Sequence, residues 1–212
     1  MAKKFLLISI LLISLEEATG QLSYGVKAGA NINTINTYLD GAPSWVDFED
    51  NVESTVGFHA GLFVAIDFSK KFSFRPEIEY IQKGKRENYP GMTQKISVNY
   101  IQLPLLFSYK IVNKFYIEAG PGFGYLLSSK SDNDIFTSPA ETYTVKLEVT
   151  ALGGFRYTLF QKVDVMARYN LGLSNIQDSK YYAQNPDTSE IIGFESVARN
   201  SGLNFSIAYY LK

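Results

Sequence analysis

The sequence has no cysteine, one histidine (His59) and one tryptophan (Trp45) in 212 residues. Without cysteine, the chain cannot form disulfides, a thiolate nucleophile, cysteine-ligated zinc or a lipid anchor on an N-terminal cysteine. A single histidine excludes a histidine-rich metal cluster and any mechanism that needs two histidines. We therefore expect neither a metal centre nor another cofactor.

Charge is scarce as well: charged residues make up 19% of the chain, against roughly 25% in ordinary soluble domains. The 20 Lys and Arg residues nearly balance the 21 Asp and Glu residues, so a nucleic-acid partner is not expected. What the sequence does contain is 15 Tyr, 15 Phe and 16 Gly. This composition suits one domain built from strands that have at least one unusually apolar face.

Residues 1–20 have the pattern of a secretory signal peptide. Lys3 and Lys4 precede an apolar run over 5–15, and Ala18 and Gly20 are small residues before Gln21. The run is too short to cross a membrane as a helix, which needs about 20 residues. The sequence thus predicts export and cleavage, with 21–212 left as a single domain.

The rest of the chain alternates apolar and polar residues with a period of two, which predicts strands. Eight segments show the pattern, at 22–32, 55–67, 72–83, 98–109, 115–126, 143–157, 163–174 and 201–211. Each is at least as long as the roughly 9–11 residues that a tilted membrane strand requires. Pro76 and Pro104 are the two residues least suited to strand interiors.

The connections alternate in length. Short turns are expected at 68–71, 110–113 and 158–161, and long loops at 33–53, 84–95, 128–142 and 176–199. All long loops then lie at one end of a barrel, an asymmetry typical of outer-membrane barrels, and both chain ends lie at the short-turn end. The short turns are basic, through Lys70, Lys71, Lys110 and Lys162.

Period two does not say which face points inward, and a secreted lipocalin-like carrier of a small apolar ligand would alternate too. Three features favour an apolar face that points outward into lipid. The polar face is rich in Gly and Ser, aromatics recur near both strand ends as interface girdles, and the charges on the polar face balance. The balanced charges are Lys27, Arg75, Lys146, Arg156, Arg168, Glu77, Glu79, Glu118, Glu148 and Asp164. The aromatics at the short-turn side are Tyr24, Phe74, Tyr109, Phe115, Tyr157 and Tyr209, and those at the loop side are Tyr80, Tyr125 and Tyr143.

The predicted fold is therefore all-β: an eight-stranded antiparallel up-and-down transmembrane β-barrel with a filled lumen. Several phrases resemble the PorT-like outer-membrane β-barrel family, an eight-stranded barrel of the OmpA/OmpX type: GVKAGANIN (25–33), PEIEYIQKG (76–84), NYIQLPLLFSYK (99–110), FYIEAGPGFGYLL (115–127), ARYNLGLSNI (167–176) and RNSGLNFSIAYYLK (199–212). The resemblance implies a protein of the Gram-negative outer membrane. It also implies a possible link to a secretion pathway, and it supplies no catalytic residues.

The residues that could carry chemistry have simpler structural explanations. His59 is expected to be a hydrogen-bonding residue of the lumen, and no G-x-S-x-G motif accompanies it. The glutamates of the polar face are expected to pair with its cations rather than to hydrolyse glycosides. The GPGFG run at 120–124 lies inside a strand and precedes no helix, so it is not a nucleotide loop. We expect no enzyme; an outer-membrane lipid-modifying enzyme is the weakest alternative.

Function is instead expected in the long loops. Residues 33–53 hold five acidic residues and no Lys or Arg. Exposed aromatics on such loops can bind partners. The candidate residues are Tyr38, Trp45, Phe48, Tyr181, Tyr182 and Phe194. The expected partners are outer-membrane lipid and lipopolysaccharide, and a protein of a secretion or assembly complex. The expected role is structural, adhesive or accessory.

Overall fold

The computed structural model describes residues 21–43, 52–89, 91–133, 137–139, 145–185 and 188–212. The predicted signal peptide over 1–20, the candidate residues Trp45 and Phe48, and the girdle aromatic Tyr143 lie outside these ranges. Among the described residues, no helix is long and apolar enough to cross a membrane.

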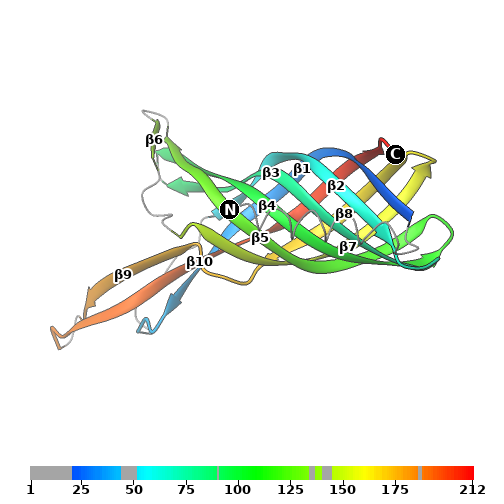
Figure 1. The fold of residues 1–212 in the computed structure, drawn as a ribbon. Coiled ribbons are helices and arrows are strands. Elements are labelled where there is room, and N and C mark those ends of the chain that lie inside the picture. The colour runs from blue at the N-terminus through cyan, green and yellow to red at the C-terminus, as the bar shows by residue number, and fades with distance from the viewer. Residues whose placement is uncertain (1–20, 44–51, 90, 134–136, 140–144, 186–187) are drawn as a thin grey trace, which may run out of the picture.

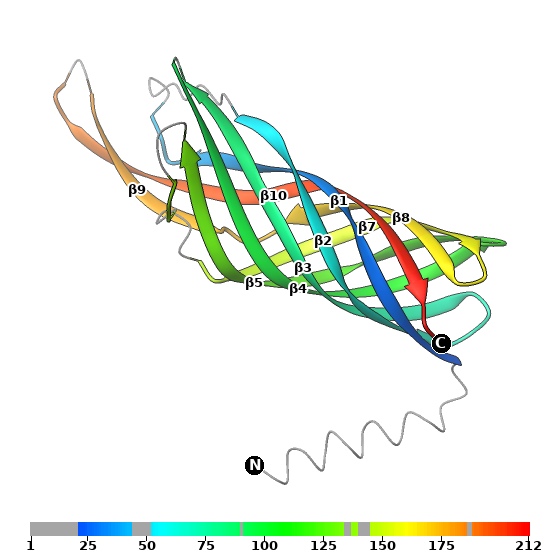
Figure 2. The same cartoon turned by 90° about the horizontal axis from the view of Figure 1, so that it is seen from above.

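The chain forms one antiparallel sheet that closes on itself (Figures 1 and 2). Neighbouring strands follow the order β1-β2-β3-β4-β5-β7-β8-β10, and β10 pairs back with β1. This ring of eight confirms the predicted up-and-down barrel. Two further strands lie outside the ring, β6 beside β5 and β9 beside β10. The strands are β1 (Gln21–Asp40), β2 (Val52–Asp67), β3 (Phe72–Tyr89), β4 (Met92–Val112), β5 (Phe115–Asn133), β6 (Thr137–Pro139), β7 (Leu147–Phe160), β8 (Val163–Gly172), β9 (Gln177–Gln184) and β10 (Ile191–Tyr210).

The short turns gather at one end of the barrel, as predicted. β2 and β3, β4 and β5, and β7 and β8 are joined there, and the start of β1 and the end of β10 lie at the same end. The C-terminus marks this end in Figures 1 and 2. In outer-membrane barrels the end with the short turns is expected to face the periplasm, and we call the opposite end the outer rim.

The predicted long loops are largely strand rather than loop. The segment 84–95 continues β3 and β4 into a hairpin that turns near Gly91, and β1 extends to Asp40. Residues 177–184 and 191–198 form a second hairpin, β9–β10. At the outer rim the barrel thus rises into two projections, one built from β3, β4 and β5 and one from β9, β10 and the end of β1 (Figure 2). Period two does not mark where a strand leaves the membrane, because pairing continues beyond it.

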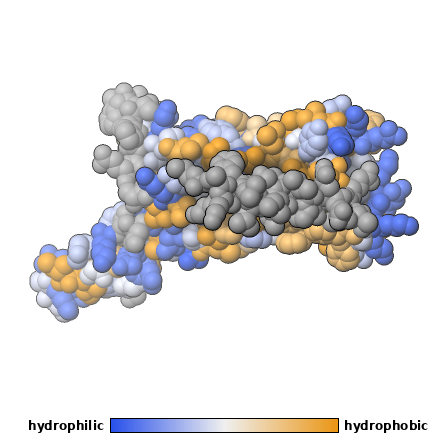
Figure 3. Space-filling model, viewed as in Figure 1, coloured by the Kyte–Doolittle hydropathy of each residue, from blue (hydrophilic) through white to orange (hydrophobic). Residues whose placement is uncertain are grey.

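The apolar face of the alternation points outward. Large hydrophobic side chains on the wall are strongly exposed, among them Leu62, Phe107, Phe155, Leu203 and Ile207. In Figure 3 hydrophobic side chains cover much of the barrel wall, while hydrophilic ones gather at the short-turn end. The lipocalin alternative is wrong, because it needs an apolar interior and an outer wall that tolerates water.

The two prolines are accommodated within strands. Pro76 lies opposite Leu105, and Pro104 lies opposite Gly122. Between the Pro76–Leu105 pair and the Glu79–Gln102 pair the β3–β4 ladder is interrupted. Proline has no N–H to donate, so a local gap in the ladder is the expected effect.

Two apolar clusters lie among the polar side chains of the lumen. Phe63, Met166 and Ala208 pack near the short-turn end. A larger cluster, which we call the outer plug, lies toward the outer end and is formed by Ile35, Ile81, Ile96, Val98, Tyr100, Ile176 and Ala198. The alternation of the sequence does not reveal the outer plug, because some of its members come from segments predicted to be loops and the others lie singly among polar neighbours.

Candidate functional site

Arg168 is the centre of a charge network in the middle of the lumen. Its guanidinium donates to both oxygens of Glu77, at 2.9 and 3.0 Å, and to Oε2 of Glu118 at 2.6 Å and, through Nε, at 2.9 Å. All three side chains are about 2% exposed or less. Buried charges are tolerated only when they are paired and hydrogen-bonded, and this arrangement meets both conditions.

The network extends around the barrel. Lys27 pairs with Glu77 and, at 2.5 Å, with Glu79. Arg156 bridges Glu118 at 2.7 Å and Asp164 at 3.0 Å. These contacts link β1, β3, β5, β7 and β8 through the lumen. The predicted pairing of inward cations and anions is confirmed for these residues.

A second ion pair lies nearer the outer rim and corrects one assignment. Lys83 bonds to Glu148 at 2.8 Å, and Asn200 donates to the other oxygen of Glu148 at 2.8 Å. Lys146 was expected to face the lumen, but it is exposed, because β7 begins only at Leu147. Lys83 and Lys85 are the buried lysines at this end; continuing the alternation of β3 past residue 83 would have identified Lys85.

Glycines allow these side chains to cross the neighbouring strand. Gly61 on β2 lies between Lys27 and Glu79, and Gly154 on β7 lies between Glu118 and Arg168. A β-carbon on Gly61 would lie 2.7 Å from Cβ of Glu79, and one on Gly154 would lie 2.9 Å from Cγ of Arg168. Each glycine therefore leaves the space in which an ion pair forms between side chains of the two neighbouring strands.

Two glycines of β1 serve the seam between the first and last strands. The ring of Phe63 on β2 passes over Gly25 and packs edge-on against Tyr210 of β10, with centroids 4.9 Å apart. The ring of His59 likewise passes over Gly29 to reach Ser206 of β10. Side chains of β2 thus hold β10 in place across β1.

His59 makes the lumen hydrogen bonds expected of it. Its Nε2 lies 2.6 Å from Oγ of Ser206, and its Nδ1 lies 3.3 Å from Oδ1 of Asn31. The order Ser–His–Asn matches that of an acyl-transfer triad. However, Ser206 is 6% exposed and His59 is 1% exposed, so no substrate carbonyl can approach the hydroxyl. Among the described residues no cluster of three or more His, Cys, Asp or Glu side chains could hold a metal ion.

The glycines of the 120–124 run also make room inside the lumen. Gln102 on β4 donates to Oγ1 of Thr150 on β7 at 3.1 Å, and a β-carbon on Gly122 of β5 would lie 2.8 Å from that amide nitrogen. Gly124 lies against Glu148 and Tyr100 in the same way. The run therefore has a packing role in a strand.

The four described aromatic candidates lie on the projection formed by β9, β10 and the end of β1. Tyr181 lies opposite Phe194, and their rings stack 6.0 Å apart. Tyr182 lies opposite Gly193, and Tyr38 of β1 lies opposite Val197. Because paired residues share a face and successive residues alternate, Tyr181 and Phe194 lie on the face that continues the lumen wall, and Tyr38 and Tyr182 lie on the outer face.

The outer face of the hairpin is the more accessible one. Tyr182 is 72% exposed and Tyr38 is 52% exposed. Beside Tyr182 a hollow of about 230 Å³ is lined by Lys180, Gly193 and Glu195. Lys180 and Glu195 form an exposed ion pair of 3.7 Å at its edge. An exposed aromatic ring beside a hollow with both charge signs is suited to protein recognition.

A match to a protein-family model agrees with this architecture. Residues 16–178 match the family model described as outer membrane protein beta-barrel domain. A search of curated proteins finds no match. Among solved structures, Neisserial surface protein A has 14% identity and a TM-score of 0.48, over 87% of this chain and 97% of the other. The outer membrane protein OprG from Pseudomonas aeruginosa has 14% identity and a TM-score of 0.45, over 91% and 97%.

The family match covers most of the sequence, and the barrel displays an apolar outer wall, a polar lumen and short turns at one end. These are the features by which such proteins reside in lipid. The chain belongs to the outer membrane protein β-barrel domain family and is an integral protein of the outer membrane.

Proposed function

We propose that this protein captures a protein partner at the outer rim, in an adhesive or secretion- or assembly-accessory role. The observation that carries the proposal is the β9–β10 hairpin, which projects beyond the barrel (Figure 1). Its residue Tyr182 is 72% exposed. Tyr182 is the most exposed of the large hydrophobic side chains in the described chain, and Ile191, 69% exposed, lies on the same face of the hairpin; neighbouring exposed apolar side chains mark interaction sites. The resemblance of the strand phrases to the PorT-like family supports an accessory role in secretion.

The proposal assigns different roles to the two faces of the projection. The stacked rings of Tyr181 and Phe194 stabilise the hairpin, since each covers the other. Tyr38 and Tyr182 are free of such a stacking contact among the described residues and are available to a partner. Within the acidic segment 33–53, Asp40 ends β1 opposite Glu195 of β10, so the described part of this projection carries negative charge; Trp45 and Phe48 of the same segment lie outside the described residues. A partner with a basic surface suits this combination.

The test compares the two faces by crosslinking in intact outer membranes, with the captured partner quantified by mass spectrometry. The double variant Tyr38→Ser/Tyr182→Ser should lower capture by about tenfold, as expected for the loss of aromatic anchors. Tyr181→Ser is the matched control and should keep capture within about twofold if the hairpin persists. Equal losses in both variants would contradict the proposal. Trp45→Ser/Phe48→Ser extends the test to the first loop.

A contact with lipopolysaccharide is a second proposal, supported by a different observation. Arg86 and Lys95 lie directly opposite each other on the outward face of β3 and β4, and both are exposed. Like charges in this position repel unless an anion lies between them. Glu53 of β2 lies opposite Arg86, and Asp132 of β5 lies opposite Lys95, so the two carboxylates lie on the outer sides of the pair and not between its members. If Arg86→Gln/Lys95→Gln leaves the thermal shift on adding lipopolysaccharide unchanged, this contact does not exist.

A further inference from the structure

The short-turn end of the barrel carries an excess of positive charge. Its lysines are Lys70, Lys71, Lys110, Lys114, Lys162 and Lys212. In the described parts of this end, 67–73, 109–116 and 157–163, Asp67 is the one acidic residue. None of these lysines forms an ion pair with a carboxylate of the described chain. This contrasts with the lumen, where the buried lysines Lys27, Lys83 and Lys85 are all paired.

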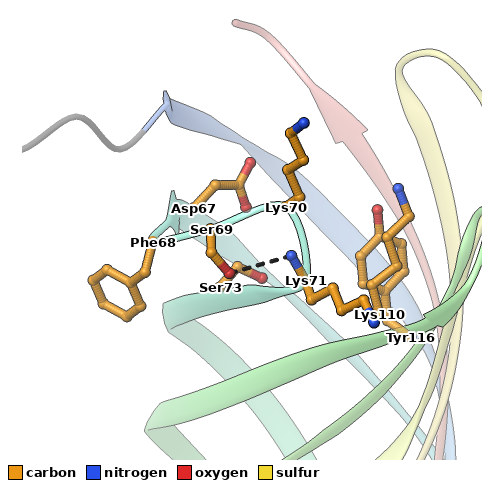
Figure 4. Close-up of a pocket in the computed structure, with 8 residues that line it drawn as sticks. All are labelled: Asp67, Phe68, Ser69, Lys70, Lys71, Ser73, Lys110 and Tyr116. Carbon is orange, nitrogen blue, oxygen red and sulfur yellow. Dashed lines mark hydrogen bonds between the residues drawn. The ribbon is translucent and has the colours of Figure 1, made fainter.

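Part of this charge surrounds a cavity, which we call the inner cup. It has a volume of about 390 Å³ and is lined by Lys70, Lys71, Lys110, Asp67, Ser73 and Tyr116, among others (Figure 4). Asp67 lies opposite Ser73, which is buried. Lys110 lies opposite Tyr116, and Tyr116 is on the same inward face of β5 as the buried Glu118. The inner cup therefore opens from the mouth of the lumen rather than from the lipid-facing wall.

Local hydrogen bonds fix the backbone that carries these lysines. The amide of Lys110 donates to the carbonyl oxygen of Lys71 at 2.8 Å. Within the turn, the amides of Lys71 and Phe72 donate to Oγ of Ser69, at 3.3 and 3.1 Å. Tyr116 lies between two cations in the sheet, with Arg156 3.8 Å and Lys110 5.8 Å from its ring centroid. The cup thus keeps its positive groups on a rigid frame.

We propose that the inner cup binds an acidic peptide segment of a periplasmic protein, at the end opposite to the outer-rim surface and independently of it. The inward opening keeps lipid headgroups away, since they lie outside the barrel wall. The volume corresponds to about a dozen waters at roughly 30 Å³ each, which leaves room for two or three carboxylate side chains. The remaining lysines around the mouth favour a chain with several negative charges over a single small anion.

The experiment uses the full-length protein in nanodiscs of zwitterionic lipid and a fluorescein-labelled hexaglutamate peptide as the probe. Fluorescence anisotropy should show binding that weakens as salt rises, because the cup is open to water and screened. Lys71→Gln/Lys110→Gln should raise the dissociation constant by about tenfold or more. The matched control Lys114→Gln/Lys162→Gln removes the same charge at the same end but outside the cup, and should raise it by less than about threefold.

Asp67→Asn provides a test that loss of folding cannot imitate. It removes the acidic residue from the cup, so it should tighten hexaglutamate binding by a few-fold. Equal weakening by both lysine pairs, or no tightening in the Asp67→Asn variant, would overturn the proposal. Inorganic phosphate forms the competing arm: if phosphate binds as tightly as the peptide, the cup is a site for small anions and the peptide assignment is wrong.

Discussion

The ion pair between Arg168 and Glu118 crosses strand β7 at Gly154, which has no side chain to obstruct it. A β-carbon at Gly154 would overlap the carbonyl oxygen of Ala167, and it would lie 2.6 Å from Cα of Arg168. Gly154→Ala should therefore destabilise the barrel by about 1–3 kcal/mol through overpacking. Urea unfolding in lipid vesicles measures the effect.

The neighbouring residue gives a matched control for this prediction. At Gly153 the nearest atom to an added β-carbon is 4.0 Å away. Gly153→Ala should change the free energy of unfolding by no more than about 0.5 kcal/mol. Equal effects at the two positions would show that the ion pair does not depend on an open position at Gly154.

A second prediction at the residue scale concerns Arg168, the centre of the charge network. Arg168→Met leaves Glu77 and Glu118 without their shared partner in a buried site, which should cost about 3–5 kcal/mol in unfolding free energy. Lys180→Met breaks the exposed pair with Glu195 and should cost less than about 1 kcal/mol. Comparable losses in the two variants would mean that the lumen pairs are as solvated as the surface pair.

At the scale of a strand, the alternation assigns one face to lipid. Leu105 and Ile207 lie on that face, and Ile207 is 61% exposed on the barrel wall. Leu105→Arg or Ile207→Arg should each cost about 2–4 kcal/mol in a bilayer if the site lies near the midplane. Tyr182→Arg on the β9–β10 hairpin is the control and should fold as the parent does. Vesicle insertion followed by denaturant titration separates the variants, and normal stability of both wall variants would contradict the face assignment.

The predictability of each element from the sequence depended on its surroundings. Strand faces were predictable wherever lipid lies on one side and a polar lumen on the other, as from Val26 to Ile32 in β1. The outer projections were not, because water surrounds them on both sides and the apolar–polar contrast weakens. Tyr182 and Phe194 were identified as exposed aromatics, yet only the register of β9 against β10 shows that they lie on opposite faces.

The lumen was partly predictable for a related reason. Composition reveals that cations and anions balance, but it does not reveal which ones meet. Lys27 reaches Glu79 because Gly61 lies between them, a relation set by strand pairing rather than by distance along the chain. Lys146 was misplaced because a strand boundary, not the alternation, decides its environment.

At the scale of the whole molecule, buried side chains fill the described part of the lumen. Ile35, Ile81 and Val98 of the outer plug are each fully buried, and Nζ of Lys83 lies 5.2 Å from the ring centroid of Tyr100, another member of the plug. An eight-stranded barrel is just wide enough for its side chains to fill. Planar-bilayer recordings should therefore show no steady current, with a general porin as the positive control. A reproducible open-pore conductance would show that the plug moves.

The seam between β1 and β10 has a consequence for how the barrel is assembled. In the native pairing Gly25 lies opposite Tyr210 and Gly29 lies opposite Ser206. A slip of two residues that brought Ala208 opposite Gly25 would deprive Phe63 of its aromatic contact, and it would present Asn204 to His59. Strand β10 thus contacts two strands at the seam: it pairs with β1, and its side chains contact those of β2. Side chains of the second strand, Phe63 and His59, therefore favour the native register of the last strand over the slipped one.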